Sequence, residues 1–217
     1  KAKNFSKDVY LPSIKENISL VSKHLRTIIR SSMIGTFIGA LPGIGSETSP
    51  WVAYGLAKRA SKKPEDFGKG SLDGVLAPEA ANNAVCGAAM IPMLVFGIPG
   101  DIVTAILMSA LIAQGLQPGP FLIVEHREVI YGLFMSVLFA TFALYIFGRL
   151  TLRWWMKILT IPPALLYSLI VAFCVVGTYS VKTSSFDLAV MFVFGVIGYI
   201  FRKLDIALAP MLLAFVL

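Results

Sequence analysis

The sequence predicts an all-α polytopic membrane protein, and three observations support this fold class. Of the 217 residues, 57% are hydrophobic and only 14% are charged, with a mean hydropathy of +0.78, a combination that is rare in soluble domains. Several apolar segments are long enough to cross a hydrocarbon core, which takes about 20 helical residues. No segment alternates polar and apolar residues as the strands of a membrane barrel do.

The distribution of charge excludes other classes of protein. The formal net charge is +7, but the basic residues gather at the ends of apolar segments, where orientation signals belong, and form no stripe with stacking aromatics. We therefore expect membrane lipid, and no nucleic acid, around the chain. Cys86 and Cys174 lie in apolar segments without a nearby cysteine or histidine ligand, so we expect no disulfide, no metal site and no bound cofactor.

Residues 1–30 are expected to form a polar connector and an amphipathic interfacial helix. Between Asn17 and Arg30 the apolar residues share one helical face, a pattern typical of a helix at a membrane surface. The chain starts without Met or a signal peptide, and its last residues belong to an apolar run that has not ended. We therefore expect the chain to be a fragment of a larger membrane protein.

The first of two helix breaks, at residues 41–49, carries a Pro-Gly pair. Pro cannot continue a helix, and Gly tolerates unusual backbone angles. The arms on either side, Ser31–Ala40 and Pro50–Ala60, are about half a span long, and both outer ends are basic. This pattern predicts a re-entrant hairpin, since a kinked crossing would place positive clusters on both sides of the membrane. Pro50 is expected in the first turn after an N-cap at Ser49.

The second break, at residues 97–101, carries another Pro-Gly pair between two helical stretches, Pro78–Phe96 and Asp101–Gln114. A basic loop precedes this segment, and residues 125–128 after it carry no net positive charge, which predicts a crossing helix interrupted at its middle. Unwound backbone at membrane depth must line a cavity or bind something. Residues 31–120 therefore form a predicted half-site for substrate or ion, in which both breaks make one wall of a cavity.

Residues 121–217 are predicted to add transmembrane helices and one interfacial helix, and to end in a truncated crossing. The predicted elements are a span at Val129–Phe147, an interfacial helix at Thr151–Leu159, spans at about Pro162–Thr178 and Leu188–Phe201, and a crossing that begins at Ile206. The basic ends of these segments alternate along the chain, which predicts that they share one face of the membrane.

Two acidic residues lie beside the breaks, Glu47 in the first and Asp101 in the second. A charged group at bilayer depth costs about 3 kcal/mol or more. Each residue is also near a helix start, where the positive end of the helix dipole stabilises an anion. Two interpretations stay open: a helix cap that binds nothing, or a group that coordinates a cation or couples a proton.

The other candidate residues supply hydroxyls, amides and unwound backbone for substrate binding. Free N–H groups and hydroxyls at a helix N-terminus bind anions without a basic side chain, while free carbonyls in the same loops suit a hard cation such as Na⁺. The adjacent amides of Asn82 and Asn83 are either ligands or inter-helix hydrogen bonds. The predicted substrate-binding residues are Pro42, Gly43, Gly45, Ser46, Thr48, Ser49, Asn82, Asn83, Pro99, Gly100 and Thr104.

Four motifs carry a resemblance to a known family. They are GALPGIGS at Gly39–Ser46, WVAYGLAKR at Trp51–Arg59, EAANNA at Glu79–Ala84 and FGIPGDIVTA at Phe96–Ala105. In order and spacing they resemble the C-terminal half of the large membrane subunit of the tripartite tricarboxylate transporters, the TctA family. The resemblance covers nearly the whole chain.

This resemblance implies a secondary transporter rather than an enzyme, which imports citrate, other tricarboxylates or related carboxylates by symport with an ion such as Na⁺. It implies a periplasmic solute-binding protein and a small four-helix membrane subunit as partners, and a multi-pass location in the inner (cytoplasmic) membrane. It also implies an inverted repeat in which this chain is one half, so that the N-terminal half of the same subunit completes the site.

One departure from the family pattern concerns Gly45-Ser46-Glu47, where family members often have Gly-Pro or small polar residues. An acid at this position would repel an anionic substrate, so Glu47 is expected to act with Asp101 in ion coupling. Two alternatives stay open: a non-transporting scaffold subunit, and a membrane-embedded enzyme, although no Ser, His or Cys constellation accompanies the acidic groups.

Overall fold

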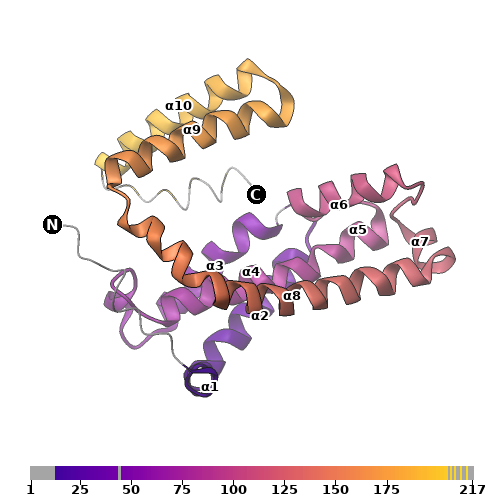
Figure 1. The fold of residues 1–217 in the computed structure, drawn as a ribbon, viewed down its shortest axis with the longest axis horizontal. Coiled ribbons are helices and arrows are strands. Elements are labelled where there is room, and N and C mark those ends of the chain that lie inside the picture. The colour runs from indigo at the N-terminus through magenta and orange to yellow at the C-terminus, as the bar shows by residue number, and fades with distance from the viewer. Residues whose placement is uncertain are drawn as a thin grey trace. The chain divides into compact units, whose positions relative to one another are not determined.

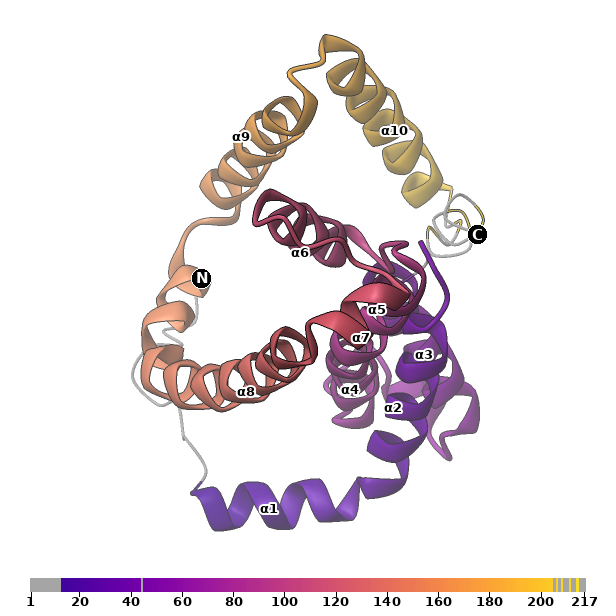
Figure 2. The same cartoon turned by 90° about the vertical axis from the view of Figure 1, so that its right-hand side faces the viewer.

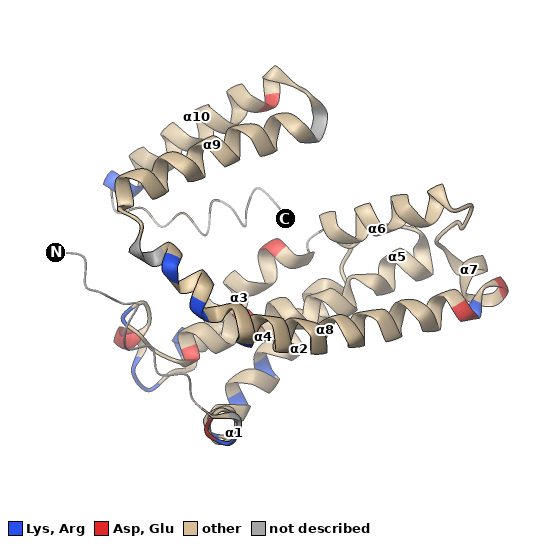
Figure 3. Cartoon of the chain, viewed as in Figure 1, with Lys and Arg blue, Asp and Glu red and all other residues tan. Residues whose placement is uncertain are grey.

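The structure is a computed structural model, and it describes residues 13–43 and 45–204 together with residues 206, 208, 211 and 214. Every regular element in this part of the chain is a helix (Figure 1), as predicted. Charged side chains gather near helix ends and leave long uncharged stretches between them (Figure 3). Four segments among the described residues are long and apolar enough to span a membrane: Asp73–Phe96, Arg127–Ile158, Pro163–Ser180 and Ser185–Lys203. The chain is therefore a polytopic helical membrane protein.

The described residues form two compact units, which divide between Thr141 and Phe142 inside one long helix. The unit that ends at Thr141 contains the candidate site. Its elements are α1 (Ile14–Lys23), α2 (Leu25–Gly39), α3 (Gly45–Ala60), the 3-10 turn η1 (Pro64–Asp66), α4 (Asp73–Ala88), α5 (Met90–Phe96), α6 (Ile102–Ala113), α7 (Pro120–Glu125) and the first half of α8 (Arg127–Trp155).

The helices α1 and α2 meet in a corner at His24, where a single amphipathic helix over Asn17–Arg30 was expected. A capping box starts α1: the Glu16 N–H donates to Ser13 Oγ (3.3 Å), and the Ser13 N–H donates to the Glu16 carboxylate (2.7 Å). At the corner, His24 Nδ1 lies 2.8 Å from Oδ1 of Asp73. Figure 2 shows α1 lying across the end of α2. The last basic residues of the expected surface helix therefore belong to the first arm of the hairpin.

Small residues let α2 and α4 pack closely. A Cβ at Gly35 would lie 2.2 Å from the carbonyl oxygen of Ala81, and a Cβ at Gly39 would lie 3.1 Å from the Cα of Val85. Both glycines therefore sit against backbone, and this spacing of small residues lets helices approach within a membrane. Gly35 lies against Ala81, and Gly39, one turn later in α2, lies against Val85, one turn later in α4. The two helices α2 and α4 therefore run parallel.

The helix α3 runs antiparallel to α4 and starts earlier than expected. It begins at Gly45, so Pro50 lies inside the helix, and the prediction of an N-cap at Ser49 is wrong. Ser49 is fully buried, and tertiary packing of this kind outweighs the local preference for a cap. Because Pro50 has no N–H, the carbonyl of Ser46 loses its partner in the helix.

The second break folds the chain back along α5. Gly97, in the left-handed region at φ 68°, ends α5, and the Ile98 N–H then donates to the Pro92 carbonyl (3.3 Å). Gly100 reaches Ala89 at the start of α5, where a Cβ would lie 2.7 Å from the Ala89 oxygen. Consequently α6 begins beside the start of α5 and runs parallel to it (Figure 1), and the expected in-line interruption is wrong.

An apolar core holds α5, α6, α7 and the start of α8 together. Its buried members are Met90, Met93, Leu94, Leu111, Leu122 and Ile130. A helix as short as α5 is not stable by propensity alone, so this packing is what maintains it. These contacts continue past residue 120, the predicted boundary between the half-site and the C-terminal helices.

The other unit contains the second half of α8, the 3-10 turn η2 (Met156–Thr160), and the helices α9 (Pro163–Lys182) and α10 (Ser185–Lys203), which pack as a hairpin. The helix α8 runs on to Trp155 and η2 follows it, so the stretch Thr151–Leu159 does not form a helix of its own; its location at the membrane interface stays a prediction. Residues 1–12, and most of the crossing predicted from Ile206, lie outside the described residues.

Candidate functional site

The two Pro-Gly breaks contact each other directly. The Gly43 N–H, from a residue at φ 82°, donates to the Gly100 carbonyl (3.1 Å). Beside this bond, a Cβ at Gly45 would lie 2.6 Å from the Cβ of Asp101 and 2.8 Å from the Gly100 oxygen. Only glycine fits at position 45 without movement of the neighbouring backbone. The first residue of α3 and the N-cap of α6 therefore lie at one point.

Asp101 is the N-cap of α6 and is 9% exposed. Its Oδ1 accepts a hydrogen bond from the Thr104 N–H (2.8 Å), and its own N–H donates to Thr104 Oγ1 (2.8 Å). The Thr104 hydroxyl lies within hydrogen-bond distance of both the Asp101 carbonyl (2.9 Å) and Oδ1 (2.8 Å). Asp101 thus has a structural role, and its carboxylate also lies where two helix N-termini meet.

The first turn of α3 carries the remaining polar residues of the first break. Glu47 is exposed and Ser46 half-buried. Thr48 and Ser49 are 3% and 0% exposed, and neither hydroxyl has a hydrogen-bond partner among the described residues. Because the first four N–H groups of an α-helix have no partner within the helix, this turn presents donors toward the break. Ser49, being fully buried, lies inside the helix packing.

Asn82 and Asn83 lie on the exposed face of α4. The opposite face of that helix packs against its neighbours through buried small residues such as Ala77 and Ala81. Asn83 Nδ2 donates to the Glu79 carbonyl (3.1 Å) of the same helix. Among the described residues, no hydrogen bond joins either amide to another helix, so these amides lie exposed on a segment apolar enough to span a membrane.

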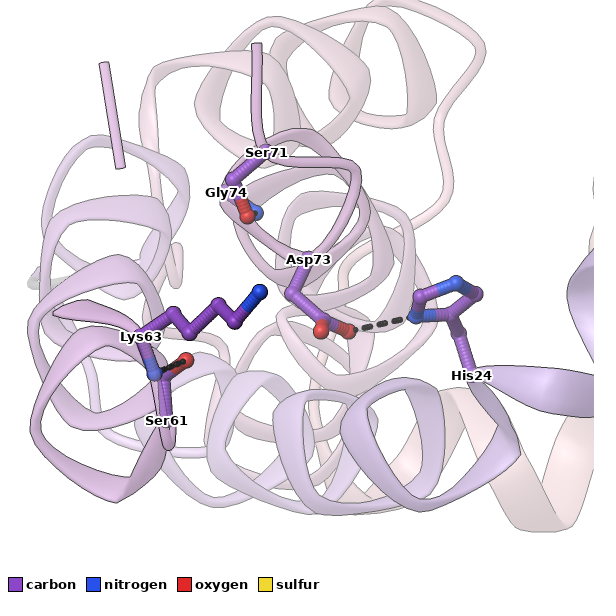
Figure 4. A network of polar contacts seen from close by, with 6 residues as sticks. All are labelled: His24, Ser61, Lys63, Ser71, Asp73 and Gly74. Carbon is purple, nitrogen blue, oxygen red and sulfur yellow. Dashed lines mark hydrogen bonds and ion pairs between the residues drawn. The ribbon is translucent and has the colours of Figure 1, made fainter. Parts of the chain in front are cut away.

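A second polar feature lies at the other end of α2 and α3, where the basic residues of the sequence predict only the orientation of the helices. A cavity of about 550 Å³ is lined there by Arg26 and Arg30 of α2 and by Lys62 and Lys63 after α3. Asp73 also lines it and pairs with His24, while Lys63 points toward Asp73 (Figure 4). The signal that predicts it is the same-sign charge at both outer ends of the hairpin, which the antiparallel α2 and α3 bring together.

The fold and the site define a multi-pass helical membrane protein in which two interrupted segments meet at one point. The chain matches the model of the Tripartite tricarboxylate transporter TctA family over residues 1–213, and it belongs to that family. The predicted resemblance is thereby confirmed. Since the members of the family are transporter components and not enzymes, the expectation that the chain is no enzyme is confirmed as well.

Two relatives from Agrobacterium vitis are each 37% identical to the chain. One, described as an uncharacterized 52.8 kDa protein in the TAR-I ttuC' 3' region, aligns over 190 residues, which are 88% of this chain and 38% of the relative. The other, an uncharacterized protein in the TAR-II ttuC' 3' region, aligns over 183 residues, 84% of this chain and 76% of the relative. The chain thus spans under two fifths of the first relative. No solved structure matches the chain.

Proposed function

We propose that this chain is part of the membrane subunit of an ion-coupled transporter that imports tricarboxylates or related carboxylates across the inner membrane. A periplasmic solute-binding protein delivers the substrate, and a small four-helix membrane subunit accompanies the large one. The N-terminal half of the same subunit supplies the opposite wall of the site. The family match supports the transporter class, and the contact between the Gly43 N–H and the Gly100 carbonyl carries the proposal of a substrate site.

The meeting of two helix N-termini explains how an anionic substrate would bind. Donors at a helix N-terminus and the positive end of its dipole favour a carboxylate. At α6 these donors are already occupied in part, because Asp101 accepts from the Thr104 N–H. The first turn of α3, with Ser46 and Thr48, is the free one, so we place the substrate carboxylate there. We assign the exposed amides of Asn82 and Asn83 to the polar groups of the substrate beyond this carboxylate.

Asp101 provides a physical reason for ion coupling. Gly45, the first residue of α3, touches Asp101, so a carboxylate bound at α3 lies close to a second negative charge. Two unit charges about 4 Å apart repel by about 4 kcal/mol at an effective dielectric constant of about 20. A cation such as Na⁺ between them removes this repulsion and gains oxygen ligands from both carboxylates. The exposed Glu47 adds negative charge to the same cation site.

Uptake of labelled citrate into proteoliposomes, with and without a Na⁺ gradient, tests the proposal on the complete transporter. Replacing Pro42-Gly43 or Pro99-Gly100 by Ala-Ala is expected to lower uptake by about tenfold or more, a change equivalent to about 1.4 kcal/mol. The matched control is Ala-Ala at Pro118-Gly119, a third Pro-Gly pair at the other end of α6. Equal losses in all three variants would mean that the chain only misfolds.

The variant Asp101→Asn distinguishes the role of Asp101 as a helix cap from the role of its negative charge. Asn caps a helix as well as Asp does, so the thermal stability of the protein is expected to stay the same. The stimulation of uptake by Na⁺ is expected to disappear, because the charge that needs the cation is gone. Full Na⁺ dependence in this variant would contradict the coupling role. A complete assembly that neither binds carboxylates nor moves ions would instead favour the non-transporting scaffold subunit.

A further inference from the structure

We propose that the basic cavity and a neighbouring groove on α2 form a binding site for one anionic phospholipid, with the headgroup in the cavity and an acyl chain in the groove. This inference does not depend on the transported substrate. It rests on the charge of the cavity, on a stripe of α2 that changes from basic beside the cavity to apolar at the edge of the groove, and on the length of that groove.

The cavity has the charge and the donors that a phosphodiester needs. Its lining includes four basic side chains, Arg26, Arg30, Lys62 and Lys63, against the carboxylates of Asp66 and Asp73. Among the described residues, none of the four basic side chains forms an ion pair with an acidic one, and Asp73 pairs with His24 instead. The Nε of Arg30 is buried without a hydrogen-bond partner in this part of the chain. Guanidinium groups bind phosphate oxygens in a bidentate manner, and Lys adds a mobile positive charge.

The groove lies along α2 on the C-terminal side of the arginines, and its lining and that of the cavity have no residue in common. It has a volume of about 650 Å³, and its lining includes Ile29, Met33 and Phe37. Met33 and Phe37 are 69% and 71% exposed, as are many large apolar side chains on the other apolar helices of this membrane protein. Arg26, Arg30, Met33 and Phe37 follow one stripe of the helix at i, i+4, i+7 and i+11 spacing, so the stripe changes from basic to apolar along one face.

The dimensions match one leaflet of a membrane. From Arg30 to Ala40, the last residue of the groove, α2 rises by about 15 Å at about 1.5 Å per residue. This is half of a hydrocarbon core of about 30 Å. The amphipathic α1, which lies across the start of α2, places that start at the membrane surface (Figure 2). A lipid whose phosphate sits between Arg26 and Arg30 therefore has its acyl chain along α2 and its methyl end at the first Pro-Gly break.

Charge complementarity selects an anionic lipid as the occupant. A small soluble anion would use the basic cavity and leave the apolar groove empty, whereas a zwitterionic lipid would bring its own cation into a cavity with excess positive charge. Basic pockets between helices at a membrane surface bind anionic headgroups for this reason.

The test uses the purified chain in an uncharged detergent, titrated with dioleoyl phosphatidylglycerol, dioleoyl phosphatidylcholine or glycerol 3-phosphate. Thermal unfolding and native mass spectrometry report binding and its stoichiometry. We expect phosphatidylglycerol to raise the unfolding temperature with saturation at one lipid per chain, and the other two probes to have little effect. Equal effects of the two lipids, or an equal effect of glycerol 3-phosphate, would overturn the proposal, the latter in favour of a site for small anions.

Double substitutions that remove two basic side chains at a time test whether the headgroup binds in the cavity. Arg26→Gln with Arg30→Gln is expected to weaken phosphatidylglycerol binding by about 30-fold, since a basic residue at an anionic headgroup contributes about 1 kcal/mol and 1.4 kcal/mol is tenfold. Lys62→Gln with Lys63→Gln, in an exposed loop, repeats the test without touching helix packing.

The matched control for these pairs is Lys58→Gln with Arg59→Gln, which removes two exposed charges from the end of α3 that do not line the cavity. This control is expected to change binding by less than about threefold, since charges outside the site are screened by salt. A loss as large as that of the Arg26 and Arg30 pair would show diffuse attraction and refute a defined site.

A further variant tests the apolar groove that is proposed to hold the acyl chain. Phe37→Ala removes an exposed ring, so the fold is expected to keep its stability while long-chain phosphatidylglycerol binds more weakly. Unchanged binding in this variant would refute the acyl-chain groove.

Discussion

Replacing Gly35 by alanine tests whether α2 and α4 meet through their backbones. The new Cβ would lie 2.2 Å from the Ala81 carbonyl oxygen, 2.8 Å from its Cα and 2.9 Å from its carbonyl carbon. All three are backbone atoms, so no change of rotamer relieves the contact. To reach an ordinary separation of 3.4 Å or more, α2 has to move by about 1.2 Å, which also opens the packing around it.

Two opposing effects determine how much Gly35→Ala changes the free energy of unfolding. Overpacking of this kind costs about 1–3 kcal/mol. Alanine in a helix interior recovers up to about 1 kcal/mol relative to glycine. The matched control is Gly55→Ala in α3, where a Cβ would meet nothing within 4 Å and only the second effect operates. Gly35→Ala is therefore expected to be less stable than Gly55→Ala by about 1–3 kcal/mol, which corresponds to about 2–12 °C in unfolding temperature for a chain of this size.

Thermal unfolding of the purified variants in detergent, followed by circular dichroism, measures this difference. Gly39→Ala should fall between the two, because its closest contact, at 2.9 Å, is with the side chain of Ala88. If Gly35→Ala unfolds at the same temperature as Gly55→Ala, the backbone contact between α2 and α4 does not exist and the register of the hairpin against α4 is wrong.

Three further substitutions test the remaining contacts by the same measurement. Thr104→Val leaves the N–H of Asp101 without its acceptor in a buried place and should cost about 1–3 kcal/mol, whereas Thr104→Ser should cost much less; similar losses would argue against the capping box. Ser49→Ala removes a buried hydroxyl that has no partner among the described residues, so stability should stay constant or rise; a clear loss would reveal a partner. His24→Ala should cost about 0.5–1.5 kcal/mol, and a double-mutant cycle with Asp73→Ala should be non-additive; additivity would contradict their hydrogen bond.

Local chemistry explains which predictions from the sequence agree with the structure. Long apolar segments have few ways to satisfy their backbone other than as helices, and Pro42-Gly43 and Pro99-Gly100 end helices wherever they occur. The spans at Pro163–Ser180 and Ser185–Lys203 are therefore close to the predicted ones. These features depend on residues within about one or two helical turns of each other.

The predictions from the sequence that are wrong concern places where contacts between residues far apart in the chain determine the local structure. Ser49 is a good cap by type, yet α3 starts at Gly45, because α3 packs from its first residue onward against Gly100 and Asp101 of the second break. The fold-back after α5 depends on Gly97 adopting φ 68° and on Gly100 fitting against Ala89. In sequence, these glycines are indistinguishable from a simple break in a straight helix.

The amino-acid sequence by itself determined the fold class, the family and the positions of the two Pro-Gly breaks, because hydropathy, motif order and the conformational limits of Pro and Gly are properties of short stretches of chain. Only the tertiary structure decided that the Gly43 N–H meets the Gly100 carbonyl, that Asp101 caps α6 beside the first residue of α3, and that Arg26 and Lys63 line one cavity. These contacts join residues up to 57 positions apart, and their register is set by close packing of small residues rather than by any local preference.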